Sequence, residues 1–205
     1  MGRIPEQMKD VVRERLIRAA ADHFARSGFD GARIDLISTD AGFAKGTVYN
    51  YFASKAELFG AVVEHGAHLA ADRFEKSNPG NSVRQQLISL AEADVSVLRE
   101  EESFTRVLVR EAMSVQPHTY PIIVEHLAPF ILKICQVIRQ GIHDGEVRRD
   151  LLPERQALLF VGMLSLLYVQ RWASGGTWPS LDEIPELLVT AFLDGAGTYT
   201  VRERA

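Results

Sequence analysis

The sequence has little of what marks a secreted, thiolate-binding or membrane protein. It holds one cysteine, Cys135, which excludes an intramolecular disulfide and a thiolate metal cluster and fits a reducing compartment. Its first residues lack the apolar core of a signal peptide, and the apolar run at residues 157–169 is too short to cross a bilayer. We therefore expect a cytoplasmic protein without a membrane segment.

Catalytic and metal-binding patterns are also missing. The chain has no glycine-rich phosphate loop after a strand, no serine-centred nucleophile elbow and no paired histidine-glutamate motif, so we do not expect an enzyme. His65 and His68 are three residues apart on one helix, but without a nearby cysteine or a third ligand, solvated or core histidines are favoured over a metal site. Cys135 occupies a core position of its helix and is favoured as a small hydrophobe over a redox sensor. No metal and no cofactor are predicted.

A broad excess of positive charge is absent as well. The net charge is −4, with 8 Lys or Arg against 7 Asp or Glu in residues 1–52 and 15 against 20 in the rest. Any contact with a polyanion therefore has to come from a few well-placed cations in the near-neutral first part, with the acidic remainder facing away.

What the chain does have is helical periodicity. Apolar residues recur every three or four positions, strand-like alternation is absent, and 46% of the residues are hydrophobic, which predicts an all-α protein of about nine helices. We predict a first domain at residues 1–53 and a second at 54–205, linked by one helix. The longer helices are expected at about residues 6–27, 54–76, 83–98, 104–115, 120–143, 153–173 and 182–199.

The segment at residues 33–58 predicts two short helices joined by a tight turn. Ile34 and Ile37 give the first an apolar face, and Gly42 can adopt the positive φ that ends it. A second helix is expected to start near Ala44. Ser54 followed by Glu57 forms a capping box for the long helix. This pattern is typical of a helix-turn-helix, whose second helix can enter the major groove of DNA.

From Leu16 to Val62 the sequence resembles the TetR (tetracycline-repressor) family of bacterial transcriptional regulators. The residues that carry the resemblance keep one fixed register: Phe24, Gly28, Phe29, Ala41, Gly42, Lys45, Gly46, Thr47, Val48, Tyr49, Asn50, Tyr51, Phe52, Ser54, Lys55, Glu57 and Leu58. The chain departs from the family where Ala32 and Arg33 replace the usual hydroxyl cap. It departs again at Asp35, where a basic or polar residue is common, and at Ser38, where a small apolar one is common.

The resemblance implies roles for the head residues, although each could by itself be an ordinary surface residue. Thr47, Tyr51 and Lys55 would hold phosphates, while Val48 and Phe52 belong to the core. Lys45, Tyr49 and Asn50 would lie nearest the base edges, Gly46 would let the backbone approach closely, and Arg33 would replace the missing cap contact electrostatically.

In the second domain the resemblance implies a cavity for a small hydrophobic effector. For each aromatic residue alone, ordinary core packing is the favoured interpretation. The candidate lining residues are Phe104, Arg110, Met113, His118, Tyr120, His126, Phe130, Met163, Tyr168 and Trp172.

The helix at about residues 153–173 is apolar on nearly every side, which predicts burial on more than one face. Together with the last helix it would form a four-helix bundle across a two-fold axis. The candidate interface residues are Leu158, Val161, Leu164, Leu188, Ala191, Phe192 and Gly195.

The favoured hypothesis is a homodimeric repressor that binds a palindromic double-stranded DNA operator and is released by an effector. A protein-interaction adaptor on the same fold, with DNA binding lost or incidental, is the alternative, and a small-molecule-modifying enzyme is a third possibility.

Overall fold

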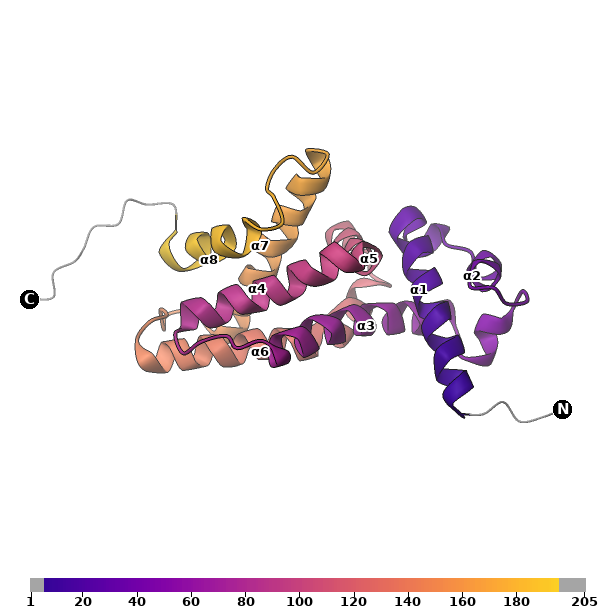
Figure 1. Ribbon diagram of the computed structural model, residues 1–205, viewed down its shortest axis with the longest axis horizontal. Coiled ribbons are helices and arrows are strands. Elements are labelled where there is room, and N and C mark those ends of the chain that lie inside the picture. The colour runs from indigo at the N-terminus through magenta and orange to yellow at the C-terminus, as the bar shows by residue number, and fades with distance from the viewer. Residues whose placement is uncertain (1–5, 196–205) are drawn as a thin grey trace, which may run out of the picture. The chain divides into compact units, whose positions relative to one another are not determined.

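The computed structural model describes residues 6–195, which form eight α-helices and one 3₁₀ helix and contain no β-strand (Figure 1). The prediction of an all-α fold is confirmed. The elements are α1 (Glu6–Gly31), α2 (Ile34–Asp40), η1 (Thr47–Asn50), α3 (Lys55–Lys76), α4 (Val83–Glu100), α5 (Glu102–Ser114), α6 (Tyr120–Asp144), α7 (Pro153–Ala173) and α8 (Ile184–Asp194).

The chain divides into two compact units. The first contains the residues up to Leu69 together with Val97–Pro129, and the second contains Ala70–Ser96 together with the residues from Phe130 onward. Helices α3, α4 and α6 therefore contribute residues to both units. The predicted division between residues 53 and 54 marks the end of the helix-turn-helix, whereas the packing groups α5 and the start of α6 with it.

The core of the first unit is built on the apolar stripe of α1. Leu16, Ala20 and Phe24 are fully buried, as the periodicity predicts, and the Phe24 ring meets the Phe59 ring of α3 edge-on at 5.3 Å. Burial of each large apolar side chain contributes roughly 1.5–3 kcal/mol. Because α2 and η1 are too short to be stable alone, this packing is what holds them.

Gly28 interrupts α1 but does not end it. Its φ of 72° and ψ of 175° break the helix at the predicted place, and one further turn then runs to Gly31. The expected end at residue 27 was therefore too early, because the chain re-enters a helical turn after a residue that has no Cβ to oppose the positive φ.

Helix α6 is the one described helix that is long and apolar enough to span a membrane by length and composition. The sequence prediction considered only the run in α7 and missed it. The apolar residues of α6 include Ile123 and Leu127, buried in the first unit, and Ile134 and Ile138, buried in the second. These residues belong to the cores of the two units, and 39% of the apolar stretch of α6 is buried.

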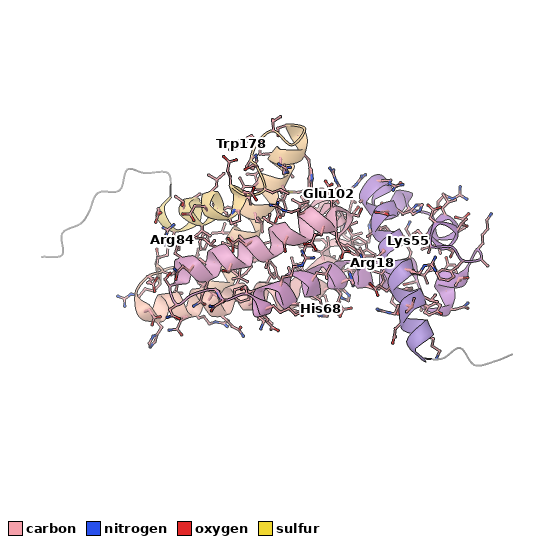
Figure 2. The ribbon with its side chains drawn as sticks, viewed as in Figure 1. Arg18, Lys55, His68, Arg84, Glu102 and Trp178 are labelled. Atoms are coloured by element: carbon pink, nitrogen blue, oxygen red, sulfur yellow. The ribbon has the colours of Figure 1, made fainter. Side chains whose placement is uncertain are left out.

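The second unit packs one side of α7 against its neighbours. Phe160 and Tyr168 of α7 are buried, and Ile184 of α8 is fully buried. Arg84 of α4, labelled in Figure 2, pairs with Asp194 of α8 through a contact of 2.6 Å between Nη2 and Oδ2.

Helix α8 ends at Asp194 and not at the predicted residue 199. Gly195 follows with a φ of 72° and donates its N–H to the Ala191 carbonyl at 3.1 Å, which closes the last turn. Residues 196–199 of the predicted helix lie outside the described residues.

Candidate nucleic-acid interface

The turn after α2 has the predicted left-handed glycine. Gly42 has a φ of 82° and donates its N–H to the Thr39 carbonyl at 2.9 Å. The next residue, Phe43, donates to the Ser38 carbonyl at 2.9 Å. These bonds end α2 and reverse the chain toward η1.

Ser38 fixes the second half of the motif to the first. Its side chain is fully buried, and its Oγ accepts a hydrogen bond from the Val48 N–H at 3.3 Å. Sequence reasoning marked Ser38 only as a departure from the family pattern. The structure shows that its hydroxyl satisfies a backbone donor at the start of η1, which an apolar residue could not do.

The second short helix of the motif is a 3₁₀ turn and not the expected α-helix. Gly46 precedes it with a φ of 82°, and the bonds from Tyr49 N to Gly46 O and from Tyr51 N to Val48 O span three residues each, at 3.0 and 2.9 Å. The segment begins at the turn of Gly42, and the buried side chains of Val48 and Phe52 fix its other end in the core. The few residues between these points form a 3₁₀ turn.

This turn places the predicted base-contacting residues at the surface. Lys45, Tyr49 and Asn50 are exposed, with 59% of the Tyr49 surface accessible. A hollow of about 640 Å³ lies beside Asn50, between the N-terminal part of α1 and the segment around η1. It is lined by Lys9, Asp10, Val12, Arg13, Phe43, Thr47, Asn50 and Tyr51.

Arg33 stands at the N-cap of α2 without a side-chain capping bond, as the loss of the hydroxyl predicts. It pairs with Asp35, with 2.8 Å between Nη2 and Oδ2 and 3.3 Å between Nε and Oδ1. The Arg33 guanidinium lowers the pKa of the Asp35 carboxyl. The positive charge that was expected to attract phosphate is therefore balanced within the same helix turn.

Lys55, labelled in Figure 2, is directed toward the end of α1. Its Nζ donates to the Asp30 carbonyl at 3.0 Å and lies 5.0 Å from the centre of the Phe29 ring. The side chain is half-buried. The structure thus gives Lys55 an internal contact where the resemblance implied a phosphate contact.

The capping box at the start of α3 forms with a shift of one residue. Glu57 N donates to Ser54 Oγ at 3.1 Å, while the Glu57 carboxylate accepts from the N–H of Ala53 at 2.6 Å. The carboxylate therefore fixes the loop that joins η1 to α3.

Helix α5 holds the end of α1. Glu111 is 4% exposed, and its Oε1 accepts the Phe29 N–H at 2.9 Å. Arg110 donates to the carbonyls of Ala25 and Arg26 at 3.3 and 3.1 Å, and His118 lies 3.2 Å from Asp30. Arg110 and His118, predicted to orient a ligand, both contact the end of α1.

The remaining predicted lining residues are divided between the two units. Phe104 is buried against the His65 ring at 4.8 Å, and Met113 and Tyr120 are exposed. His126 faces the backbone of Gly60, where an added Cβ would lie 2.6 Å from its Nε2. These belong to the first unit, whereas Phe130, Met163, Tyr168 and Trp172 belong to the second, in which the Tyr168 and Trp172 rings lie 6.2 Å apart.

Histidine and acidic side chains do not converge on a metal-binding group within residues 6–195. Burial lowers the pKa of His65, with a further lowering from the Arg18 charge.

The predicted subunit interface needs a correction. Leu164 and Leu188 are 3% and 0% exposed, so they belong to the core of the second unit and are not available to a partner. The sequence did not reveal which apolar side of α7 faces the core of its own chain, because α7 is apolar on several sides. Leu158, Val161, Ala191, Phe192 and Gly195 are exposed or half-buried, and Leu159, Leu166 and Leu187 are exposed large hydrophobics that the prediction omitted.

A short helical head with a glycine turn and an exposed second element defines a helix-turn-helix protein. Residues 16–62 match the family described as bacterial regulatory proteins, tetR family. This segment therefore matches the N-terminal domain of that family.

Two curated relatives are described as HTH-type transcriptional proteins, one as a regulator and one as a repressor. The HTH-type transcriptional regulator SrpR of Pseudomonas putida is 25% identical over 201 residues, which covers 92% of this chain and 94% of that protein. The HTH-type transcriptional repressor NicS of Pseudomonas putida is 42% identical over 59 residues, which covers 29% of this chain and 28% of that protein.

Solved structures share the fold over nearly the whole chain. The transcriptional regulator FadR from Bacillus subtilis, in complex with stearoyl-CoA, has a TM-score of 0.78 at 19% identity and covers 90% of this chain and 99% of its own. AibR, in complex with isovaleryl coenzyme A and operator DNA, has a TM-score of 0.67 at 16% identity and covers 89% of this chain and 98% of its own.

Proposed function

We infer that this protein is a cytoplasmic, ligand-responsive repressor that binds a palindromic DNA operator as a homodimer. The observation that carries the proposal is the exposed set of Lys45, Tyr49 and Asn50 on a turn whose backbone is pinned by Ser38. A lysine and an asparagine can donate to base edges in the major groove, and backbone N–H groups and hydroxyls nearby can hold phosphates.

Dimerisation is supported by the outer side of α7. Leu158, Leu159 and Leu166 are each more than half exposed, and Leu187 of α8 is 37% exposed. Exposed leucines at this spacing form an apolar face that a second copy of the chain could cover. The two heads would then address half-sites about one helical turn apart.

Effector control is supported by the relatives and by the helix continuity. FadR and AibR have been solved with acyl-coenzyme A molecules. An apolar effector of this protein would act in the predicted second domain, residues 54–205, which contains the whole second unit. Since α3 begins at the capping box of the head and continues into the second unit, a change in that unit can alter the head through one helix. The shift is limited by the preference of the effector for one state over the other.

The test is a gel-shift titration with the promoter DNA of the protein's own gene. Lys45→Ala should weaken binding roughly tenfold or more, because a contact to a base edge contributes ~1–3 kcal/mol. Arg149→Ala is the matched control, since Arg149 is exposed in the second unit and its loss changes the net charge equally. Equal binding by both variants would count against the assignment of this head.

An adaptor that binds a protein partner remains the second candidate, and one observation favours it. Two of the three predicted DNA-contacting cations, Arg33 and Lys55, are engaged within the chain. Absence of retardation at low salt would favour the adaptor over the repressor.

A further inference from the structure

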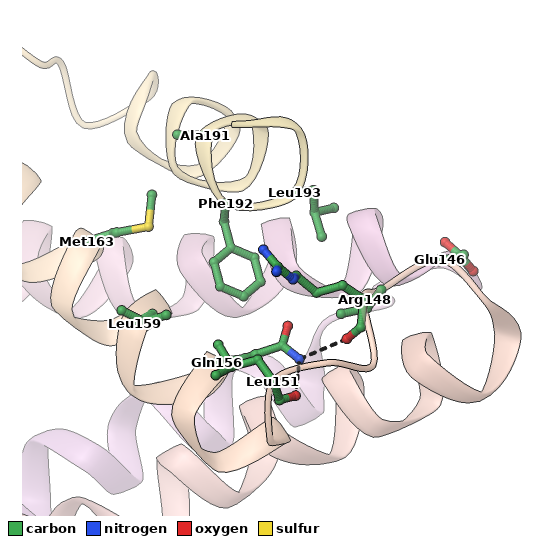
Figure 3. Close-up of a pocket in the computed structure, with 10 residues that line it drawn as sticks. Glu146, Arg148, Leu151, Gln156, Leu159, Met163, Ala191, Phe192 and Leu193 are labelled. Carbon is green, nitrogen blue, oxygen red and sulfur yellow. Dashed lines mark hydrogen bonds between the residues drawn. The ribbon is translucent and has the colours of Figure 1, made fainter. Parts of the chain in front are cut away.

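The second unit contains a pocket that adjoins the proposed dimer face and shares Leu159 with it. It has a volume of about 230 Å³ and lies between α7, α8 and the loop that precedes α7 (Figure 3). Leu159 and Met163 of α7 and Phe192 and Leu193 of α8 supply apolar walls. A cavity of roughly 150 Å³ accommodates benzene, so this pocket is large enough for a substituted ring.

Gln156 forms the polar floor of this pocket. The residue is 3% exposed, and its Nε2 donates to the carbonyls of Arg148 and Leu151 at 3.1 and 2.8 Å. Both acceptors are carbonyls, so the nitrogen end of the amide is fixed toward the loop. The Oε1 end points toward Phe192 and Arg148 (Figure 3) and accepts no hydrogen bond from the described residues.

An acceptor held in this way needs an explanation. The two bonds of Nε2 account for the nitrogen end of Gln156, because they fasten the loop to α7. They do not account for Oε1, which opens onto the pocket and can accept a hydrogen bond from a group that occupies it. A ligand with a hydroxyl or N–H group would satisfy it.

The rim of the pocket restricts the charge of such a ligand. Arg148 pairs with Asp150, with 2.6 Å between Nε and Oδ1, and the Arg148 guanidinium holds the pKa of Asp150 at about 2. The pair is therefore balanced in charge, and Glu146 is a further lining residue whose side chain is directed away from Phe192 and Gln156 (Figure 3). An anionic ligand would meet the Gln156 oxygen and a guanidinium whose charge Asp150 already balances, whereas a hydroxyl can donate to Oε1 and accept from the guanidinium.

We propose that this pocket binds a small uncharged phenol or alcohol, whose hydroxyl donates to Gln156 Oε1 and whose apolar body packs between Met163 and Phe192. The site does not rest on the repressor function, because its occupancy can be measured without DNA.

The test is a titration of the full-length protein with 4-ethylphenol, followed by calorimetry and by the NMR signal of the Met163 methyl group. We expect saturable binding at one site per chain together with a shift of that signal. Ethylbenzene, which lacks the hydroxyl, should bind about tenfold more weakly, and 4-ethylbenzoate should bind more weakly still. Equal binding of 4-ethylphenol and ethylbenzene, or no saturable binding at all, would overturn the proposal.

Two variants separate the site from effects on folding. Ala191→Phe adds a ring to an exposed residue that lines the pocket and leaves the bonds of Gln156 intact, so it should abolish binding, while Ala191→Ser should not. Gln156→Leu removes the acceptor and should reduce the preference for 4-ethylphenol over ethylbenzene to near unity, with circular dichroism checking that the chain is folded. Unchanged binding by Ala191→Phe would show that the probe binds elsewhere and would overturn the assignment.

Discussion

The Phe29 backbone N–H donates to Glu111 Oε1 at 2.9 Å, across 82 residues of sequence. This bond joins the last turn of α1, just after the break at Gly28, to a buried carboxylate of α5. An added Cβ on Gly28 would lie 3.2 Å from the same Oε1. The Glu111 carboxylate therefore lies where a side chain at position 28 would need room. The bond fastens the last turn of α1 to α5.

We expect Glu111→Ala to lower the free energy of unfolding by roughly 1–3 kcal/mol, because it leaves the Phe29 N–H without its acceptor. Glu111→Gln keeps a carbonyl oxygen at the same place and should cost less. Urea unfolding of the two variants measures the difference. Equal losses would show that the negative charge of Glu111, and not the hydrogen bond, is what matters.

Asp35→Asn should strengthen DNA binding several-fold and steepen its salt dependence by about one unit, because it releases the Arg33 guanidinium and removes a carboxylate near phosphate. Gel shifts at several salt concentrations provide the measurement. In an Arg33→Ala background the same substitution should have a smaller effect. An equal gain in both backgrounds would mean that Arg33 takes no part.

Lys55→Met and Lys45→Ala distinguish the sequence hypothesis from the structure. Lys55→Met keeps the apolar stem over Phe29 but loses the bond to the Asp30 carbonyl, so it should lower stability by roughly 0.5–1.5 kcal/mol and leave the slope of binding against salt unchanged. Lys45→Ala should reduce that slope by about one unit. If Lys55→Met reduces the slope equally, Lys55 turns outward to phosphate in the complex.

Asp94 predicts a pH dependence of stability. Burial raises the pKa of its carboxyl from 3.8 to about 7, an effect that the neighbouring Tyr168 hydroxyl only partly offsets. The folded state then binds more protons than the unfolded state between these values, so the contribution of Asp94 to stability falls as the pH rises from about 4 to about 7.

Asp94→Asn should remove this slope and, at pH 8, should raise the free energy of unfolding by roughly 1–3 kcal/mol, since one pKa unit corresponds to ~1.4 kcal/mol and the residue keeps part of its surface at solvent. Thermal unfolding of both proteins from pH 5 to pH 8 tests it. Parallel curves for the two proteins would exclude this role of Asp94.

The sequence by itself determined the features that depend on neighbouring residues in the chain. The stripe of Leu16, Ala20 and Phe24, the left-handed turn at Gly42 and the capping of α3 by Ser54 follow from helical periodicity and from backbone conformations that few residues adopt. Local signals of this kind are sufficient to locate the helix-turn-helix in the sequence.

Only the tertiary structure decided which groups meet across long stretches of chain. Periodicity places Leu164 and Leu188 on an apolar face but does not reveal that the same chain covers it. Composition shows that Lys55 is charged but not that the Asp30 carbonyl and the Phe29 ring engage it. Glu111 gave no signal in the sequence, because its partner is a backbone N–H, which every residue except proline has.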